Sequence, residues 1–119
     1  MECVFCKIIS GEIPSYKIYE DEYVYAFLDI HPDSVGHTLI IPKKHYQDLQ
    51  DIDDEMVFHI LQVAKILKKR LEEKLQCDGL TLIQNNGKVQ EVKHFHLHLK
   101  PFYSNKKNKT VEETYNLLK

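Results

Sequence analysis

The 119-residue sequence lacks the two features that would place a protein in a membrane or on a secretory route. It contains no run of about 18 apolar residues, the minimum for a transmembrane helix. Its first residues lack the basic and apolar segments of a signal peptide. We therefore expect a cytoplasmic protein with no membrane partner.

The chain also has little excess of charge of either sign. The chain has 16 Lys and Arg against 18 Asp and Glu, a formal net charge of -2. This balance argues against a nucleic-acid surface built from bulk charge, so no nucleic-acid partner is expected. The length suits one hydrophobic core. We predict a single domain over 1–119, with its core at about 3–103 and a C-terminal tail with a short helix at 104–119.

Cysteine is limited to three residues, two of them in Cys3-Val4-Phe5-Cys6. An odd number with one CxxC fits a reducing compartment and a metal or redox site better than a disulfide framework. A lone CxxC fits two reduced, buried cysteines equally well, and this alternative stays open. Cys77 is predicted to be a lone thiol with no assigned task.

The apolar pattern predicts a mixed fold. Asp53 is a candidate N-cap for a long helix with an apolar stripe at steps of three and four. Runs of adjacent strands indicate an α+β fold with an antiparallel sheet of about five strands. Small chains often cover sheet edges by dimerising, so a homodimer is expected. The predicted short helices are 3–10 and 110–119, and the predicted strands are 16–20, 23–30, 37–41, 80–84 and the segment from His94.

Histidine alternates with large apolar residues from His94 to Leu99. This period predicts a half-buried strand, ended by Pro101, with three imidazoles on one face. Imidazole titrates near neutrality, so the face is a candidate for proton transfer, nucleophilic attack or metal binding. The three histidines span roughly 13 Å, too far for all to bind one ion. The plainer alternative, a solvated cluster or a tag, does not account for the alternation with core residues.

Two other positions have a structural and a functional interpretation. Asp29 ends an aromatic strand face, where it either caps the turn at 31–34 or binds a ligand. Asn85-Asn86-Gly87 is either a plain turn or a source of N–H and amide donors for an oxyanion beside the imidazoles. The residues alone leave both choices open.

The triad His94-x-His96-x-His98, followed by Leu99, resembles the histidine triad family. The resemblance extends over 3–14, 27–30, 36–45 and 85–87. It is strongest for the small bacterial-type branch of nucleotide phosphoramidases and dinucleoside polyphosphate hydrolases.

The resemblance implies covalent catalysis on a nucleotide. His96 would attack the α-phosphorus to give a nucleotidyl-histidine that water hydrolyses. His98 would bind phosphate or protonate the leaving group, and His37 would orient the cluster. Two alternatives remain: a purine-nucleotide-binding module with little catalysis, and a zinc-dependent hydrolase that uses the triad as metal ligands.

The resemblance also implies the contacts around the substrate and a structural zinc ion. Asp29 would bind the ribose hydroxyls. The phosphate contacts would be Asn85, Gln90 and the backbone N–H near Val92; the walls around a purine would be Phe5, Ile8, Ile13 and Ile30. The zinc ligands would be Cys3, Cys6, His45 and His94.

The sequence departs from the family pattern just before the triad. The loop after Asn-Asn-Gly is only Lys88-Val89. Glu91 stands where relatives often have serine. A carboxylate there should repel an anionic substrate unless it points away or pairs with Lys88 or Lys93.

Overall fold

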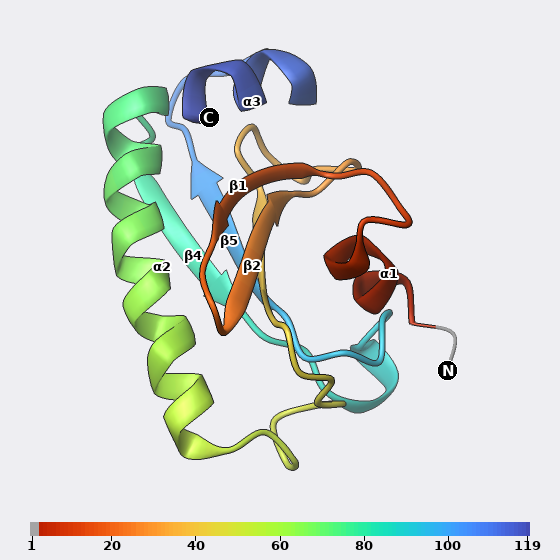
Figure 1. The fold of residues 1–119 in the computed structure, drawn as a ribbon. Coiled ribbons are helices and arrows are strands. Elements are labelled where there is room, and N and C mark those ends of the chain that lie inside the picture. Colours follow the sequence, from red (N-terminus) through yellow and green to blue (C-terminus); the bar gives the residue numbers. More distant parts are fainter. Residues whose placement is uncertain (1–2) are drawn as a thin grey trace.

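A computed structural model describes residues 3–119, which form five strands, three α-helices and one 3-10 helix (Figure 1). The helices are α1 (Val4–Ser10), α2 (Asp54–Leu75), η1 (Gly87–Val89) and α3 (Val111–Leu118). The strands are β1 (Tyr16–Glu20), β2 (Val24–Leu28), β3 (Thr38–Pro42), β4 (Gly79–Ile83) and β5 (Leu97–Phe102).

The strands form one antiparallel sheet in the order β1-β2-β3-β5-β4. Helix α2 lies along one face of this sheet, and α1 lies on the other side of the molecule (Figure 1). The α+β prediction is confirmed. The order brings β5, which carries the end of the histidine triad, between β3 and β4 near the middle of the sheet.

The main core lies between α2 and the sheet. Asp53 caps α2 by accepting a hydrogen bond from the Met56 N–H at 2.8 Å, as its position predicts. The helix buries its apolar stripe against aliphatic residues of the strands; the buried residues of α2 are Ile60, Val63, Ala64, Leu67, Leu71 and Leu75. Leu118 of α3 belongs to the same cluster. The segment expected to be a tail beyond residue 103 therefore contributes to the core.

A second apolar cluster fixes α1 on the opposite face of the sheet. Phe5 and Ile8 of α1 pack there against Phe27 and Leu39 of the strands. The Cys3 sulfur accepts a hydrogen bond from the Cys6 N–H at 3.3 Å, so the CxxC itself caps the helix. The consequence is that both cysteines are held above the sheet face that carries the histidines.

The histidine strand differs from its predicted extent. β5 begins at Leu97 and runs through Pro101 to Phe102. Before β5, the Phe95 N–H donates to the Tyr46 carbonyl at 2.7 Å instead of joining the sheet. Pairing of β3 with β5 ends at Leu99, so Pro101 has a sheet partner on one side only, and its missing donor is tolerated.

Two turns depend on special backbone conformations. Helix α2 ends at Leu75, and its C-cap Gln76 adopts a left-handed φ of 56°. Gly36 has a φ of 88°, and a Cβ there would lie 2.5 Å from a methyl carbon of Leu75. Glycine at 36 therefore lets the loop before His37 pack closely on α2.

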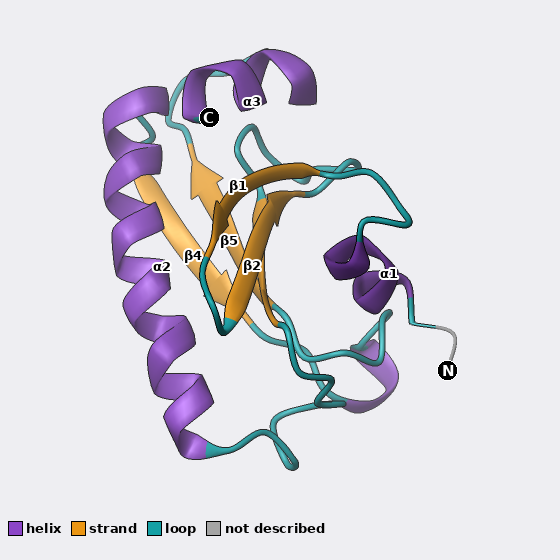
Figure 2. Cartoon of the chain, in the orientation of Figure 1, coloured by secondary structure: helices purple, strands orange, loops and turns teal. Residues whose placement is uncertain are grey.

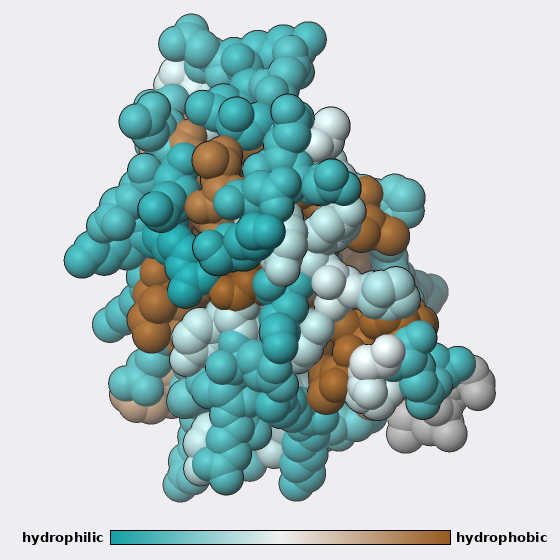
Figure 3. Space-filling view, turned by 45° about the horizontal axis from the view of Figure 1, so that its top comes forward, coloured by the Kyte–Doolittle hydropathy of each residue, from teal (hydrophilic) through white to brown (hydrophobic). Residues whose placement is uncertain are grey.

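Polar residues cover most of the face seen in Figure 3, and apolar residues show only in small areas between them. Within residues 3–119, no helix is long and apolar enough to cross a membrane.

Candidate active site

Two loops far apart in the sequence meet at one end of the sheet. The loop after β3 and the loop before β5 run together there (Figure 2). The Leu49 N–H donates to Asn86 Oδ1 at 2.9 Å, and Gln90 Nε2 donates to the Gln47 carbonyl at 2.7 Å. These bonds place His45 beside the first triad histidine.

A cavity of about 490 Å³ opens between α1, the sheet, the loop after β2 and the loop before β5. Its size is in the range of small-molecule sites. Its apolar lining includes Phe5, Ile8, Ile13, Phe27, Ile30 and Leu39. Its polar lining includes Asp29, His37, Asn85, Glu91, His96, His98 and Lys100. The predicted wall residues and catalytic histidines thus lie around one space.

His96 is held in one ring orientation by its own chain. Its Nδ1 lies 2.8 Å from the His94 carbonyl oxygen, an acceptor only, so Nδ1 carries the proton. The lone pair is then on Nε2. Burial lowers the pKa of His96, which keeps the ring neutral, and Phe5 packs edge-on against it with ring centres 5.1 Å apart. Neutral imidazole with a free Nε2 is the nucleophilic form.

His37 and His98 form a directed pair. The Asp33 N–H donates to His37 Nδ1 at 3.1 Å, so the proton of His37 is on Nε2. That N–H donates to His98 Nδ1 at 2.9 Å, and the proton of His98 is left on its Nε2. Burial, with smaller contributions from the neighbouring histidines, lowers the pKa of His98 to about 4.

Asp29 caps the turn after β2 and also lies at the cavity. Its Oδ1 accepts a hydrogen bond from the His31 N–H at 2.8 Å, which caps the turn. Its Oδ2 lies 3.7 Å from His37 Nε2, and the residue also lines the cavity. The carboxylate is therefore fixed at one oxygen and available on the cavity side.

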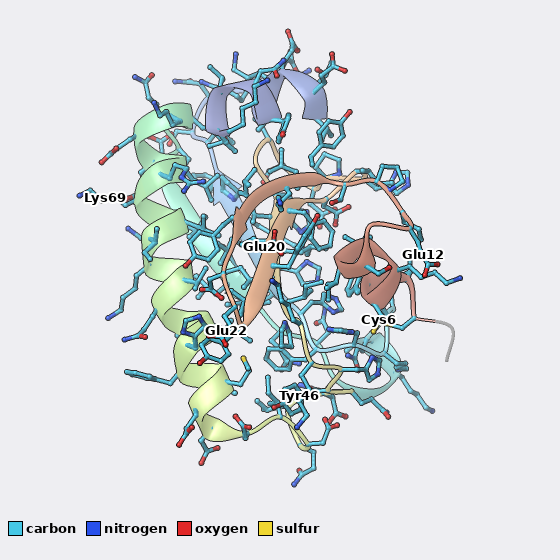
Figure 4. All side chains as sticks on the ribbon, viewed as in Figure 1. Cys6, Glu12, Glu20, Glu22, Tyr46 and Lys69 are labelled. Carbon is cyan, nitrogen blue, oxygen red and sulfur yellow. The ribbon has the colours of Figure 1, made fainter. Side chains whose placement is uncertain are left out.

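A second cluster joins the start of α1 to the loops after β3 and before β5: the ligand atoms of Cys3, Cys6, His45 and His94 all lie within 4.8 Å of one another. His94 Nε2 donates to the Pro42 carbonyl at 2.8 Å, so its Nδ1 is the unprotonated atom. That Nδ1 lies 3.3 Å from the Cys3 sulfur, and His45 Nδ1 lies 3.4 Å from the Cys6 sulfur. Figure 4 shows Cys6 on α1 and Tyr46 on the loop after β3, the loop that also carries His45.

This donor set fits zinc. Two sulfur and two imidazole ligands, converging at contact distance, are the chemistry of a closed structural zinc site. Burial and the adjacent Cys3 raise the pKa of the Cys6 thiol to about 11, so the thiolate needed for binding requires a cation beside it. The triad is thus divided: His94 faces the cysteines, whereas His96 and His98 face the cavity.

The structure brings Asn85 and Val92 to the cavity but not Gln90. Gln90 is 3% exposed, its Nε2 is used by Gln47, and its Oε1 has no partner among the described residues. Ile30 lies at the rim, 63% exposed. Lys100 lines the cavity although sequence reasoning did not select it. Its position two residues after His98, in the alternating pattern, is the signal that was missed.

The family model for the HIT domain matches residues 10–105. The chain belongs to the histidine triad (HIT) family. Among its relatives is the adenosine 5'-monophosphoramidase of Saccharomyces cerevisiae, 50% identical over 101 residues that cover 83% of this chain and 61% of the yeast protein. These findings support a nucleotide-binding, hydrolase-like protein of this family.

Solved structures confirm the HIT fold. A zinc-bound histidine triad protein from Mycobacterium smegmatis matches with a TM-score of 0.92 and 40% identity, over 99% of this chain and 91% of that one. A hypothetical histidine triad nucleotide-binding protein from Sulfolobus tokodaii matches with a TM-score of 0.88 and 35% identity, over 98% and 86%.

Proposed function

We propose that the protein is a nucleotide hydrolase or transferase that acts at the α-phosphate through His96. The observation that carries the proposal is the single orientation of the His96 ring. Its Nδ1–H is held by the His94 carbonyl at 2.8 Å, and the ring lines the cavity. A neutral imidazole fixed in this way presents Nε2 as a nucleophile without reorganisation.

The reaction divides into two displacements. In the first, His96 Nε2 forms a bond to the α-phosphorus while the bond from phosphorus to the leaving group breaks. The centre of the His98 ring lies 4.8 Å from that of the His96 ring, and its Nε2–H is the donor left to support the phosphate or to protonate the leaving group, because His37 occupies Nδ1. In the second displacement, water attacks phosphorus, the P–N bond to His96 breaks, and a nucleoside monophosphate leaves.

The apolar and polar residues that line the cavity suit the parts of a purine nucleotide. Apolar residues such as Phe5 and Ile8 can pack against a base, and Asp29 can accept hydrogen bonds from ribose hydroxyls. Asn85 and Val92 also line the cavity, and we assign them to the phosphate. Gln90 has no place in this proposal, because its amide is committed to Gln47.

We assign zinc a structural role, with Cys3, Cys6, His45 and His94 as ligands. When bound, the ion supplies a fixed link between α1 and the segment before β5. The ligands His45 and His94 lie on the two loops that frame the triad, so this link would hold His96 in register. The expected homodimer and cytoplasmic location stay predictions.

The test is hydrolysis of an adenosine phosphoramidate by the wild-type protein and His96→Ala. We expect release of adenosine monophosphate to be abolished in His96→Ala, with folding intact by circular dichroism. His59→Ala removes a histidine of α2 outside the cavity and should retain turnover. Undiminished turnover by His96→Ala would contradict the proposal.

The two alternatives, a nucleotide-binding module and a zinc hydrolase, predict different results. Calorimetric binding of a purine monophosphate, with no turnover of any phosphoramidate or polyphosphate, would indicate a binding module. If Cys3→Ser retains its fold but loses zinc and activity in the same proportion, a zinc hydrolase is indicated.

A further inference from the structure

Lys100 links β5 to the loop that precedes β3. It follows His98 by two positions, so the two side chains lie on the same face of β5, and both residues line the cavity. β3 begins at Thr38, which pairs with Leu99 at the end of the contact between β3 and β5. Lys100 therefore lies beyond the start of β3, where its side chain reaches the loop between β2 and β3.

The residue that Lys100 contacts in this loop is Asp33. Lys100 Nζ lies 2.6 Å from Asp33 Oδ2, and the lysine side chain is 26% exposed whereas the aspartate side chain is 66% exposed. An ion pair that is open to solvent contributes little to the free energy of unfolding. The importance of this pair comes instead from the second bond that Asp33 makes.

Asp33 connects the ion pair to the two histidines behind it. The Asp33 N–H donates to His37 Nδ1 at 3.1 Å, and the His37 Nε2–H donates to His98 Nδ1 at 2.9 Å. His98 and Lys100 are two positions apart on β5, which closes a ring of four residues. In this ring, the carboxylate of Asp33 is anchored by Lys100 while its backbone N–H sets the tautomers of both imidazoles.

Other hydrogen bonds hold the loop on either side of Asp33. The Asp29 N–H donates to the His37 carbonyl at 2.9 Å, which closes the base of the loop. The Tyr103 hydroxyl donates to the Val35 carbonyl at 2.7 Å. Because these bonds do not involve the Asp33 carboxylate, we expect the loop to stay folded when the ion pair is lost, while Asp33 itself is released.

The charge of Lys100 also favours the neutral form that the histidine pair requires. A protonated His98 would present a second N–H to His37 Nε2–H, and two donors cannot form a hydrogen bond. Burial lowers the pKa of both rings, that of His98 to about 4, and the positive charge of Lys100 lowers both further. Asp29 and Asp33 act in the opposite direction on the pKa of His37. Lys100 thus offsets the carboxylates that favour protonation.

We propose that Lys100 is a positioning residue for His98: by anchoring Asp33, it fixes the tautomers of His37 and His98, so that His98 carries its proton on Nε2. Lys100 takes no part in bond making. The effect on catalysis rests on the proposed function, whereas the tautomers are a property of the protein without substrate. The two can therefore be tested separately.

The first test measures the tautomers directly. Long-range proton–nitrogen NMR spectra of the imidazoles show which ring nitrogen carries the proton. In the wild-type protein at neutral pH, we expect protonated Nε2 and unprotonated Nδ1 in both His37 and His98. Lys100→Met should move the nitrogen shifts of both rings towards values averaged between the two tautomers. Lys100→Arg, which can still donate to Asp33, should restore the wild-type shifts. Wild-type shifts retained in Lys100→Met would overturn the proposal.

The second test determines whether Lys100 acts through His37. With an adenosine phosphoramidate, Lys100→Met should lower kcat by about tenfold, part of the loss caused by a misplaced reacting group, and leave KM nearly unchanged. In a His37→Ala background the same change should cause no further loss, since the ring is already broken there. An equal loss of kcat in both backgrounds would mean that Lys100 acts independently of His37, contrary to the proposal.

Lys68→Met is the matched control, because Lys68 Nζ lies 2.7 Å from Glu72 Oε2 in an ion pair on α2, outside the cavity. It should keep the wild-type tautomers and the wild-type kcat. If the wild-type protein does not hydrolyse the phosphoramidate, the proposed function fails, and the NMR measurement alone decides whether Lys100 sets the tautomers of the histidine pair.

Discussion

His37 Nε2 lies 2.9 Å from His98 Nδ1, and a backbone N–H from Asp33 fixes which of the two nitrogens carries the proton. His98 cannot then place its own proton on Nδ1, so its N–H is directed from Nε2. His37, in the loop before β3, thereby sets the tautomer of His98 on β5. This relationship makes His37 a positioning residue for His98.

Replacement of His37 by alanine should lower kcat by about 100-fold, the scale of a misplaced reacting group. KM should change little, because the substrate contacts lie elsewhere in the cavity. Steady-state kinetics check this, with His59→Ala as the control. His37→Gln, whose amide can still donate to His98 Nδ1, should recover part of kcat. A kcat for His37→Ala equal to that of the wild-type protein would argue against a positioning role.

Stability should fall as the pH drops from about 6.5 towards 4. Burial lowers the pKa of His98 to about 4, so in this interval the unfolded chain binds a proton that the folded protein does not. Unfolding is therefore favoured as the pH falls. Urea titrations at several pH values measure the effect, and the difference between wild type and His98→Asn at each pH cancels the shared contribution of the metal ligands. An identical pH dependence in both proteins would contradict the assignment.

Asp29→Asn should weaken discrimination between ribose and 2'-deoxyribose substrates. A carboxylate accepts hydrogen bonds from both ribose hydroxyls, whereas an amide offers one acceptor oxygen and a donor. We expect the ratio of kcat/KM for adenosine and 2'-deoxyadenosine phosphoramidates to fall by about tenfold. Use of the ratio separates this effect from any influence of Asp29 on His37, 3.7 Å away. A ratio unaffected by the change would place the ribose elsewhere.

Cys6→Ser should lose zinc and lower the melting temperature, because one of the four converging ligands is removed. Elemental analysis and thermal unfolding measure the two effects. Cys77→Ser is the matched control, since Cys77 lies outside the cluster and should keep the metal content of the wild-type protein. Full zinc content in Cys6→Ser would show that the metal is held by other groups.

Much of the site followed from local patterns in the sequence. Alternation placed the histidines opposite Phe95, Leu97 and Leu99, and these three residues do lie in the main core. The same alternation, carried two residues further, would have included Lys100. The pairing of Cys3 and Cys6 with His45 and His94 required the family resemblance, because the four residues are up to 91 positions apart in the chain.

What the sequence could not supply was the long-range geometry. Gln90 resembles a phosphate ligand by position, yet the fold uses its amide to hold the loop after β3. β5 begins at Leu97 because Tyr46, distant in sequence, takes the backbone N–H of Phe95. The division of three similar histidines between two clusters depends on the carbonyls of Pro42 and His94, whose positions no local pattern encodes.

The central claim is covalent catalysis by His96. The most direct measurement is to quench the reaction rapidly without acid and then to determine the mass of the intact protein and map its peptides by mass spectrometry. With an adenosine phosphoramidate, the account predicts a transient adduct with the mass of one adenylyl group, on the peptide that contains His96, absent from His96→Ala. Rapid turnover with no adduct at any time, or an adduct mapped to another histidine, would contradict it.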